Sequence, residues 1–107
     1  MLGEFEYLVL ASTIRLGEDA YGVALRLDIE SITGRSCSVG ALYTTLDRLE
    51  SKGLVKTWTG DATPRRGGRP KRLVRTTPQG MEAAEAFYET VLRASRGICW
   101  KKNLAPS

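Results

Sequence analysis

SVGALYTTLDRLESKGLV, residues 38–55, is the stretch of this 107-residue chain that decides its fold. Its apolar side chains recur at steps of three, four and three residues, which is the spacing along one face of an α-helix. These side chains are Val39, Leu42, Leu46 and Leu49. Ser38 is a candidate N-cap, and Lys52 followed by Gly53 is a typical helix end. The stretch therefore predicts a helix with one buried face.

The opposite face of this helix is small at its start and cationic further on. It carries Gly40, Ala41 and Thr44, and then Arg48. Small residues let a helix lie close against the backbone of another polymer. The alternative, a core helix with an ordinary solvated face, stays open on this stretch alone.

Charge is distributed unevenly along the chain, although the net value is only +4. Residues 1–50 carry four cations and eight anions, whereas residues 51–77 carry eight cations and one anion. A basic patch of this density is typical of a protein that binds a polyanion. The alternative is a solvated basic loop.

Several classes of protein do not fit the composition. Two cysteines, Cys37 and Cys99, do not make a disulfide-stapled domain or a zinc site, and Cys37 suits a small buried position. The chain has no histidine, the commonest general base. No apolar run approaches the ~18–20 residues that span a bilayer, and Glu4 and Glu6 stand where a signal peptide is cationic. We therefore expect a cytoplasmic protein that is not an enzyme, with no metal, cofactor or membrane partner.

Two further helices are predicted before residue 38. Residues 3–16 are apolar around most of the circumference, which favours burial on more than one side. Residues 20–33 form the second helix, with Asp19 as candidate N-cap and Gly34 as the glycine that ends it. Two helices, a tight connection and a third helix indicate a helix-turn-helix.

Two short strands and a long helix are predicted after residue 53. The strands, residues 54–59 and 71–76, flank a basic loop, and together these residues form a wing. Thr77 and Pro78 then open a helix to about residue 96, roughly 30 Å long. A domain this small cannot cover such a helix, so we expect a second subunit to do so. The alternative is a helix that lies across its own domain.

These elements predict a mainly α fold with a small β-hairpin, α+β in class. Residues 1–77 would be a winged helix-turn-helix DNA-binding domain, and residues 78–107 a C-terminal dimerisation helix and tail.

Three motifs together resemble the PadR family of bacterial transcriptional regulators over about residues 2–96. The first is LGEFEYLVL near the start, residues 2–10. The second is DAYGVALRLDIESITGRSCSVGALYTTLDRLESKGLV, residues 19–55. The third is GGRPKRLVRTTPQG, residues 67–80. Each motif alone is weak, and their combination is specific.

The resemblance implies a homodimer, built through the first and last helices, that binds a palindromic operator. Many members of the family are repressors that a small phenolic or drug-like effector releases. The single C-terminal helix resembles the short-tailed branch. This chain departs from many relatives at Thr44-Thr45, where they carry a proline, and residues 97–107 match no pattern of the family.

The candidate DNA-binding residues fall in two groups. The predicted third helix would place five residues near base edges and phosphates: Ser38, Gly40, Tyr43, Thr44 and Arg48. The wing would supply cations to phosphates and to the minor groove: Arg65, Arg66, Arg69 and Lys71. Alternatively, Tyr43 is a buried structural residue, and Arg48 pairs with Asp47 or Glu50.

Aromatic side chains of the first helix and the C-terminal region are candidates for a dimer interface and effector pocket: Phe5, Tyr7, Phe87, Tyr88 and Trp100. The alternative is ordinary interface packing. For the chain as a whole, the competing function is a winged-helix module that binds proteins without reading DNA. The concentrated basic segment favours DNA.

Overall fold

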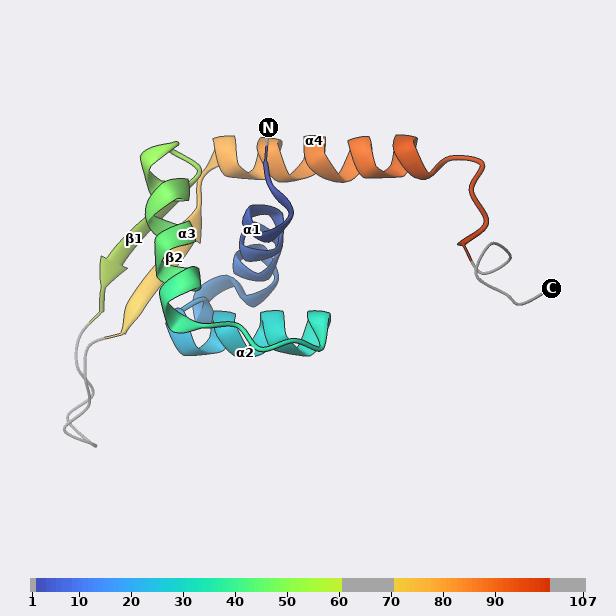
Figure 1. Cartoon of the computed structure of the whole chain (residues 1–107). Helices are drawn as coiled ribbons and strands as arrows, with labels where there is room; N and C mark the ends of the chain where they lie inside the picture. The colour runs from blue at the N-terminus through green and yellow to red at the C-terminus, as the bar shows by residue number, and fades with distance from the viewer. Residues whose placement is uncertain (1, 61–70, 101–107) are drawn as a thin grey trace.

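Four α-helices and one β-hairpin form the part of the chain that the computed structural model describes, residues 2–60 and 71–100 (Figure 1). In chain order they are α1 (Glu4–Leu16), a 3₁₀ turn η1 (Gly17–Asp19), α2 (Gly22–Thr33), α3 (Val39–Ser51), β1 (Val55–Thr59), β2 (Arg72–Thr76) and α4 (Pro78–Ser95). The predicted fold class is confirmed, and the predicted elements begin and end within two residues of the observed ones.

Local side-chain chemistry sets most helix ends. The Ser38 hydroxyl accepts a hydrogen bond from the Ala41 N–H at 3.1 Å, and Thr77 accepts one from Gly80 at 3.0 Å. Gly34 ends α2 at a φ of 69°, in the left-handed region that favours glycine. These caps were expected from the sequence and are confirmed.

The start of α2 differs from the expectation. Asp19 was the candidate N-cap, but the N-cap is Tyr21, whose side chain makes no cap hydrogen bond. The prediction was wrong because Asp19 is taken up in η1, and the backbone of Tyr21 is extended and forms a β-bridge with Leu73 of the hairpin. A long-range contact has displaced the local cap.

The core lies between α1, α2, α3 and the inner face of the hairpin. Its members are buried side chains from all of these elements, with Ala84 from α4: Val9, Leu10, Ala20, Leu25, Ile29, Cys37, Leu42, Leu46, Leu49, Val55, Val74 and Ala84. Val39, expected in the buried stripe of α3, is 52% exposed. That expectation was wrong because Val39 is the first residue of the helix, at the rim of the core beside Val23 and Gly22.

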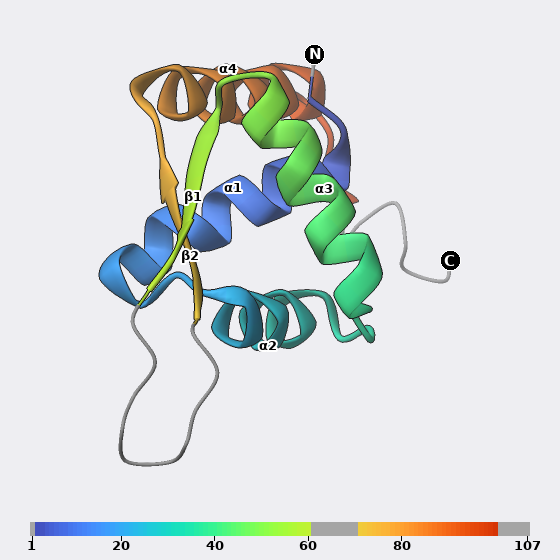
Figure 2. The ribbon, with the colours of Figure 1, turned by 90° about the vertical axis from the view of Figure 1, so that its left-hand side faces the viewer.

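The hairpin is antiparallel and is attached to the start of α2. Its register runs from Val55 opposite Thr76 to Thr59 opposite Arg72. The Val74 N–H donates to the Ala20 carbonyl at 2.9 Å, beside the bridge to Tyr21. Figure 2 shows the hairpin and α3 side by side on one face of the molecule.

α4 packs tightly at its start and little further on. A Cβ on Gly80 would lie 2.1 Å from the Leu54 carbonyl oxygen, so only glycine allows this approach. Gly80 and Ala84 are the buried residues of the helix, and its C-terminal half extends past α1 and α2 (Figure 1). In the described part of the chain, no helix has the length and hydrophobicity needed to span a membrane.

Candidate nucleic-acid interface

α3 presents a small, uncharged surface at its N-terminal end. Ser38, Gly40 and Thr44 are all exposed, and a Cβ on Gly40 would meet no atom within 4 Å. Further along, Arg48 is exposed on the same side of the helix. We call Gly40, Thr44 and Arg48 the outer strip of α3. Its small start allows close approach to another surface.

Tyr43 is half-buried between α2 and the hairpin. A Cβ on Gly22 would lie 2.4 Å from the tyrosine hydroxyl oxygen, so glycine is needed where the ring packs on α2. The Arg72 guanidinium carbon lies 5.1 Å from the centre of the ring, within range of a cation–π contact. The ring therefore packs between α2 and the hairpin.

Arg48 does not pair with either neighbouring carboxylate. Asp47 binds Arg72 at 2.8 Å, and Glu50 accepts hydrogen bonds from the N–H and hydroxyl groups of Thr57 at 3.1 and 3.0 Å. Both acids of α3 thus point toward the hairpin, which leaves the Arg48 guanidinium exposed at the outer strip.

The basic residues of the wing are only partly within the described structure. Arg65, Arg66 and Arg69 lie outside the described residues. Lys71 is exposed, with its ammonium 4.3 Å from the centre of the Tyr21 ring. Lys56 and Arg75 are exposed cross-strand partners of the same sign. Like charges opposite each other destabilise a sheet, so a nearby polyanion would relieve this pair.

An ion pair fixes the end of α3 on α1. The Glu6 carboxylate is buried and accepts hydrogen bonds from Lys52 at 2.8 Å and from the Gly3 N–H at 2.9 Å. The hydrogen bond from Lys52 is the largest cause that lowers the pKa of Glu6. Sequence reasoning did not find this contact, because nothing local links residues that are 46 positions apart.

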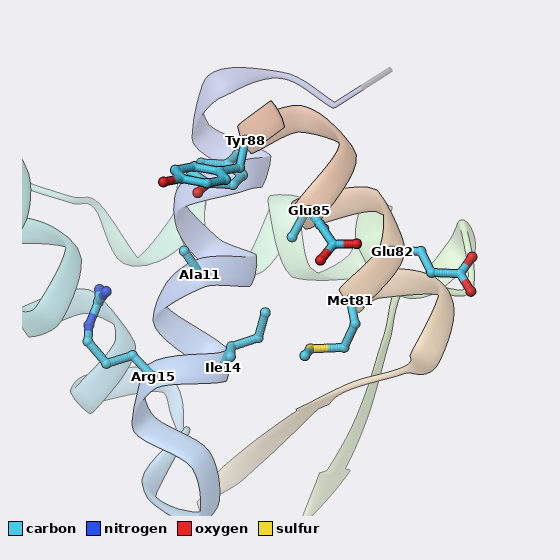
Figure 3. A pocket seen from close by; sticks show the side chains of 9 residues that line it. Ala11, Ile14, Arg15, Met81, Glu82, Glu85 and Tyr88 are labelled. Atoms are coloured by element: carbon cyan, nitrogen blue, oxygen red, sulfur yellow. The ribbon is translucent and has the colours of Figure 1, made fainter. Parts of the chain in front are cut away.

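A groove runs between α1 and α4 on another side of the molecule (Figure 3). Its volume is about 610 Å³, and its lining is mostly apolar, with charged side chains at the edge: Tyr7, Ala11, Ile14, Arg15, Met81, Glu82, Ala84, Glu85 and Tyr88. In Figure 3, Ile14 of α1 faces Met81 of α4 across it. This is a concave apolar surface of the size that small ligands occupy.

The structure brings together three of the five aromatic residues assigned to an interface and pocket. Tyr7 and Phe87 stack with ring centres 4.8 Å apart, and Tyr7 and Tyr88 line the groove. Phe5 lies elsewhere, in a hollow beside the α2–α3 connection. Trp100 is exposed, five residues beyond the end of α4. Ile14 and Met81 were not among the five, although their places on the helical stripes could have indicated them.

The described residues hold no group of three or more histidine, cysteine or acidic side chains placed to bind a metal ion.

Comparison with known proteins gives one family and many related structures. The sequence model of the transcriptional regulator PadR-like family matches residues 9–86. No curated protein sequence matches the chain.

Three solved structures illustrate the structural likeness. A PadR family transcriptional regulator from Eggerthella lenta is 25% identical, with a TM-score of 0.68 over 97% of this chain and 88% of that one. A transcriptional regulator from Clostridium thermocellum is 22% identical, with a TM-score of 0.70 over 85% of each chain. Bacillus subtilis PadR in complex with operator DNA is 18% identical, with a TM-score of 0.66 over 79% of this chain and 46% of that one.

Proposed function

Because this chain belongs to the PadR-like family of transcriptional regulators, we propose that it is a dimeric repressor of a palindromic operator, released by a small effector. The observation that carries the proposal is the outer strip of α3, small at its start and flanked by a hairpin in the most basic segment of the chain. The related Bacillus subtilis protein was crystallised with operator DNA. The protein would act in the cytoplasm and carry no catalytic site.

In this proposal α3 enters the major groove with its N-terminal end leading. Gly40 and Thr44 would face base edges, while Ser38, Tyr43 and Arg48 would contact phosphates. No long amide or lysine side chain lies on the first turn of the helix, so water-mediated and shape-dependent recognition would supply much of the specificity.

The wing supplies the remaining positive charge. Arg65, Arg66, Arg69 and Lys71 would neutralise phosphates, and the arginines suit a narrow minor groove. If each subunit contacts ~3–4 phosphates, the slope of log K against log salt should be about −6 for a dimer.

A second copy of the chain is the proposed partner of α4. Tyr88, Val91 and Leu92 are about half exposed, in a run of apolar side chains that nothing covers in one described subunit. Residues 1–77 would then bind DNA and residues 78–107 would dimerise. A twofold dimer of this kind matches a palindromic operator.

The effector would bind in the groove between α1 and α4. Tyr7 and Tyr88 offer ring faces, and Ile14 and Met81 offer flexible apolar contacts, which suits a flat aromatic molecule. Phe87 supports this wall through its stack on Tyr7. Phe5 and Trp100 would contribute only if the second subunit brings them to the groove.

Fluorescence anisotropy tests the proposal with two ~30-base-pair duplexes, one from just upstream of the gene and one scrambled. We expect the upstream DNA to bind ~10³-fold or more tighter, with two subunits per duplex and a steep salt slope. Replacing Arg65, Arg66 and Arg69 by Ala should leave the fold intact and flatten that slope. Equal, weak binding of both duplexes would instead favour a winged-helix module that binds proteins.

A further inference from the structure

Arg72 is the centre of a side-chain cluster between the hairpin and α3. Its guanidinium donates to the Asp47 carboxylate at 2.8 Å, lies over the Tyr43 ring and is 3.5 Å from the Thr57 hydroxyl oxygen. We call Arg72, Asp47, Tyr43 and Thr57 the Arg72 cluster. Thr57 in turn donates to Glu50, so two acids of α3 are engaged by the hairpin.

The position of the cluster along the hairpin allows it to fix the orientation of the hairpin relative to α3. The hairpin leaves α3 at Val55, which the short turn after Lys52 holds close to the helix. Arg72 lies at the other end of the ladder, opposite Thr59. At that end, Arg72 contacts α3, while Lys71 and Leu73 contact Tyr21 at the start of α2. The Arg72 cluster therefore links the far end of the hairpin to α3.

The charges of the cluster are unusual for a surface that meets a polyanion. Asp47 lies at the edge of the outer strip, and its side chain is 68% exposed, whereas that of Arg72 is 28% exposed. An exposed carboxylate at such a surface repels phosphates unless a cation neutralises it. Arg72 is more buried and already occupied by three partners, so it is poorly placed to serve as a free phosphate ligand.

We propose that Arg72 is a positioning residue, which locks the hairpin against α3 through Asp47 and Tyr43 so that both elements meet DNA at a fixed angle. The inference rests on the proposed DNA-binding function. Its consequence is that Asp47 supports sequence-specific binding in spite of its negative charge.

The direction in which one substitution changes DNA affinity separates this role from a simple effect of charge. Asp47→Ala removes a carboxylate from the DNA-facing side and places a good helix former in α3. If Arg72 acted by its charge alone, this variant would bind every DNA more tightly. We expect instead about a tenfold loss of affinity for the tightest duplex selected from a random pool, as for other strongly coupled side chains, and no loss for a scrambled duplex.

Further variants test whether Arg72 and Asp47 act together on DNA affinity. Arg72→Gln should weaken the selected duplex by a similar factor, and the double variant, which keeps the wild-type net charge, should be no better than Arg72→Gln. Arg72→Lys keeps the charge but not the planar group over Tyr43, so its affinity should lie between those of Arg72→Gln and the wild type. Glu4→Ala, the same charge change at an exposed site on α1, should weaken neither duplex. Wild-type affinity in the double variant, or tighter binding by Asp47→Ala, would overturn the proposal.

A measurement without DNA keeps this inference separate from the proposed function. Amide hydrogen exchange in β1 and β2 should speed up about fivefold in Asp47→Ala and Arg72→Gln, and should not change in Glu4→Ala. Unchanged exchange would show that the cluster does not hold the hairpin. If the wild-type protein selects no duplex, the proposed function fails and with it the role toward DNA, while the exchange result still decides whether the cluster locks the hairpin against α3.

Discussion

α3 and α4 have the same kind of amphipathic pattern but opposite surroundings. Leu42, Leu46 and Leu49 repeat along α3, and all three are buried. Met81, Tyr88 and Val91 share a stripe of α4 with the buried Ala84, and they are 50%, 51% and 46% exposed. An apolar stripe thus indicates which face of a helix will be covered, but not whether the same chain covers it. Substitutions in the two stripes test that difference.

The largest expected effect comes from the covered stripe. Leu46→Ala should lower the free energy of unfolding by about 3 kcal/mol, because it leaves a cavity among α1, α2 and α3. Urea denaturation at a protein concentration that keeps one oligomeric state measures this. A loss below about 1 kcal/mol would mean that the core relaxes around the site.

A substitution in the exposed stripe of α4 should affect the association of subunits. Val91→Asp should raise the dissociation constant of the proposed dimer about 100-fold, since it would bury a charge in the interface. Sedimentation equilibrium measures this, and circular dichroism should show helices intact. Ala86→Asp is the matched control, because this exposed residue is on the opposite side of α4. Equal effects of the two variants would contradict an interface at the Val91 stripe.

The Glu6–Lys52 pair makes the anchoring of α3 dependent on pH. Hydrogen bonding by Lys52 holds the pKa of Glu6 below its ordinary value of 4.5, so its stabilising effect is present above that value and is lost as pH falls through the lowered pKa. Glu6→Gln should cost about 1.5 kcal/mol at pH 7. Urea denaturation should show that the difference in the free energy of unfolding between this variant and the wild type narrows below pH 4.5. A difference that stays constant down to pH 3 would show that the effect comes from packing.

The smallest expected effect is the difference in stability between variants of the two N-caps. Ser38→Ala should cost about 1 kcal/mol, since it removes one hydrogen bond at the start of α3. Thr77→Ala should cost more, about 2 kcal/mol, because Thr77 both caps α4 and donates to the Gly53 carbonyl at 2.7 Å. Thermal denaturation of both variants measures the difference. The reverse order would mean that the contact to Gly53 contributes little.

Much of the fold could be predicted from the sequence, and the site only in part. Helix caps could be predicted because each acts on the end of its own helix, within a few residues in the sequence: Ser38, Gly34 and Thr77. Gly40 and Thr44 follow from helical periodicity as an exposed strip. Asp19 failed as a cap and Val39 as a core residue, because the path of the chain around them depends on contacts with other elements.

Sequence alone determined the order of the elements, most of their ends, the small strip on α3 and the location of the positive charge. These depend on hydrogen bonds, periodicity and composition within a few residues. Only the tertiary structure decided that Arg72 holds Asp47 across 25 positions, that Lys52 holds Glu6 across 46, and that the stripe of α4 stays open. The physical reason is that such contacts depend on where packing places whole elements, and many residue pairs of suitable charge would be equally compatible with the sequence.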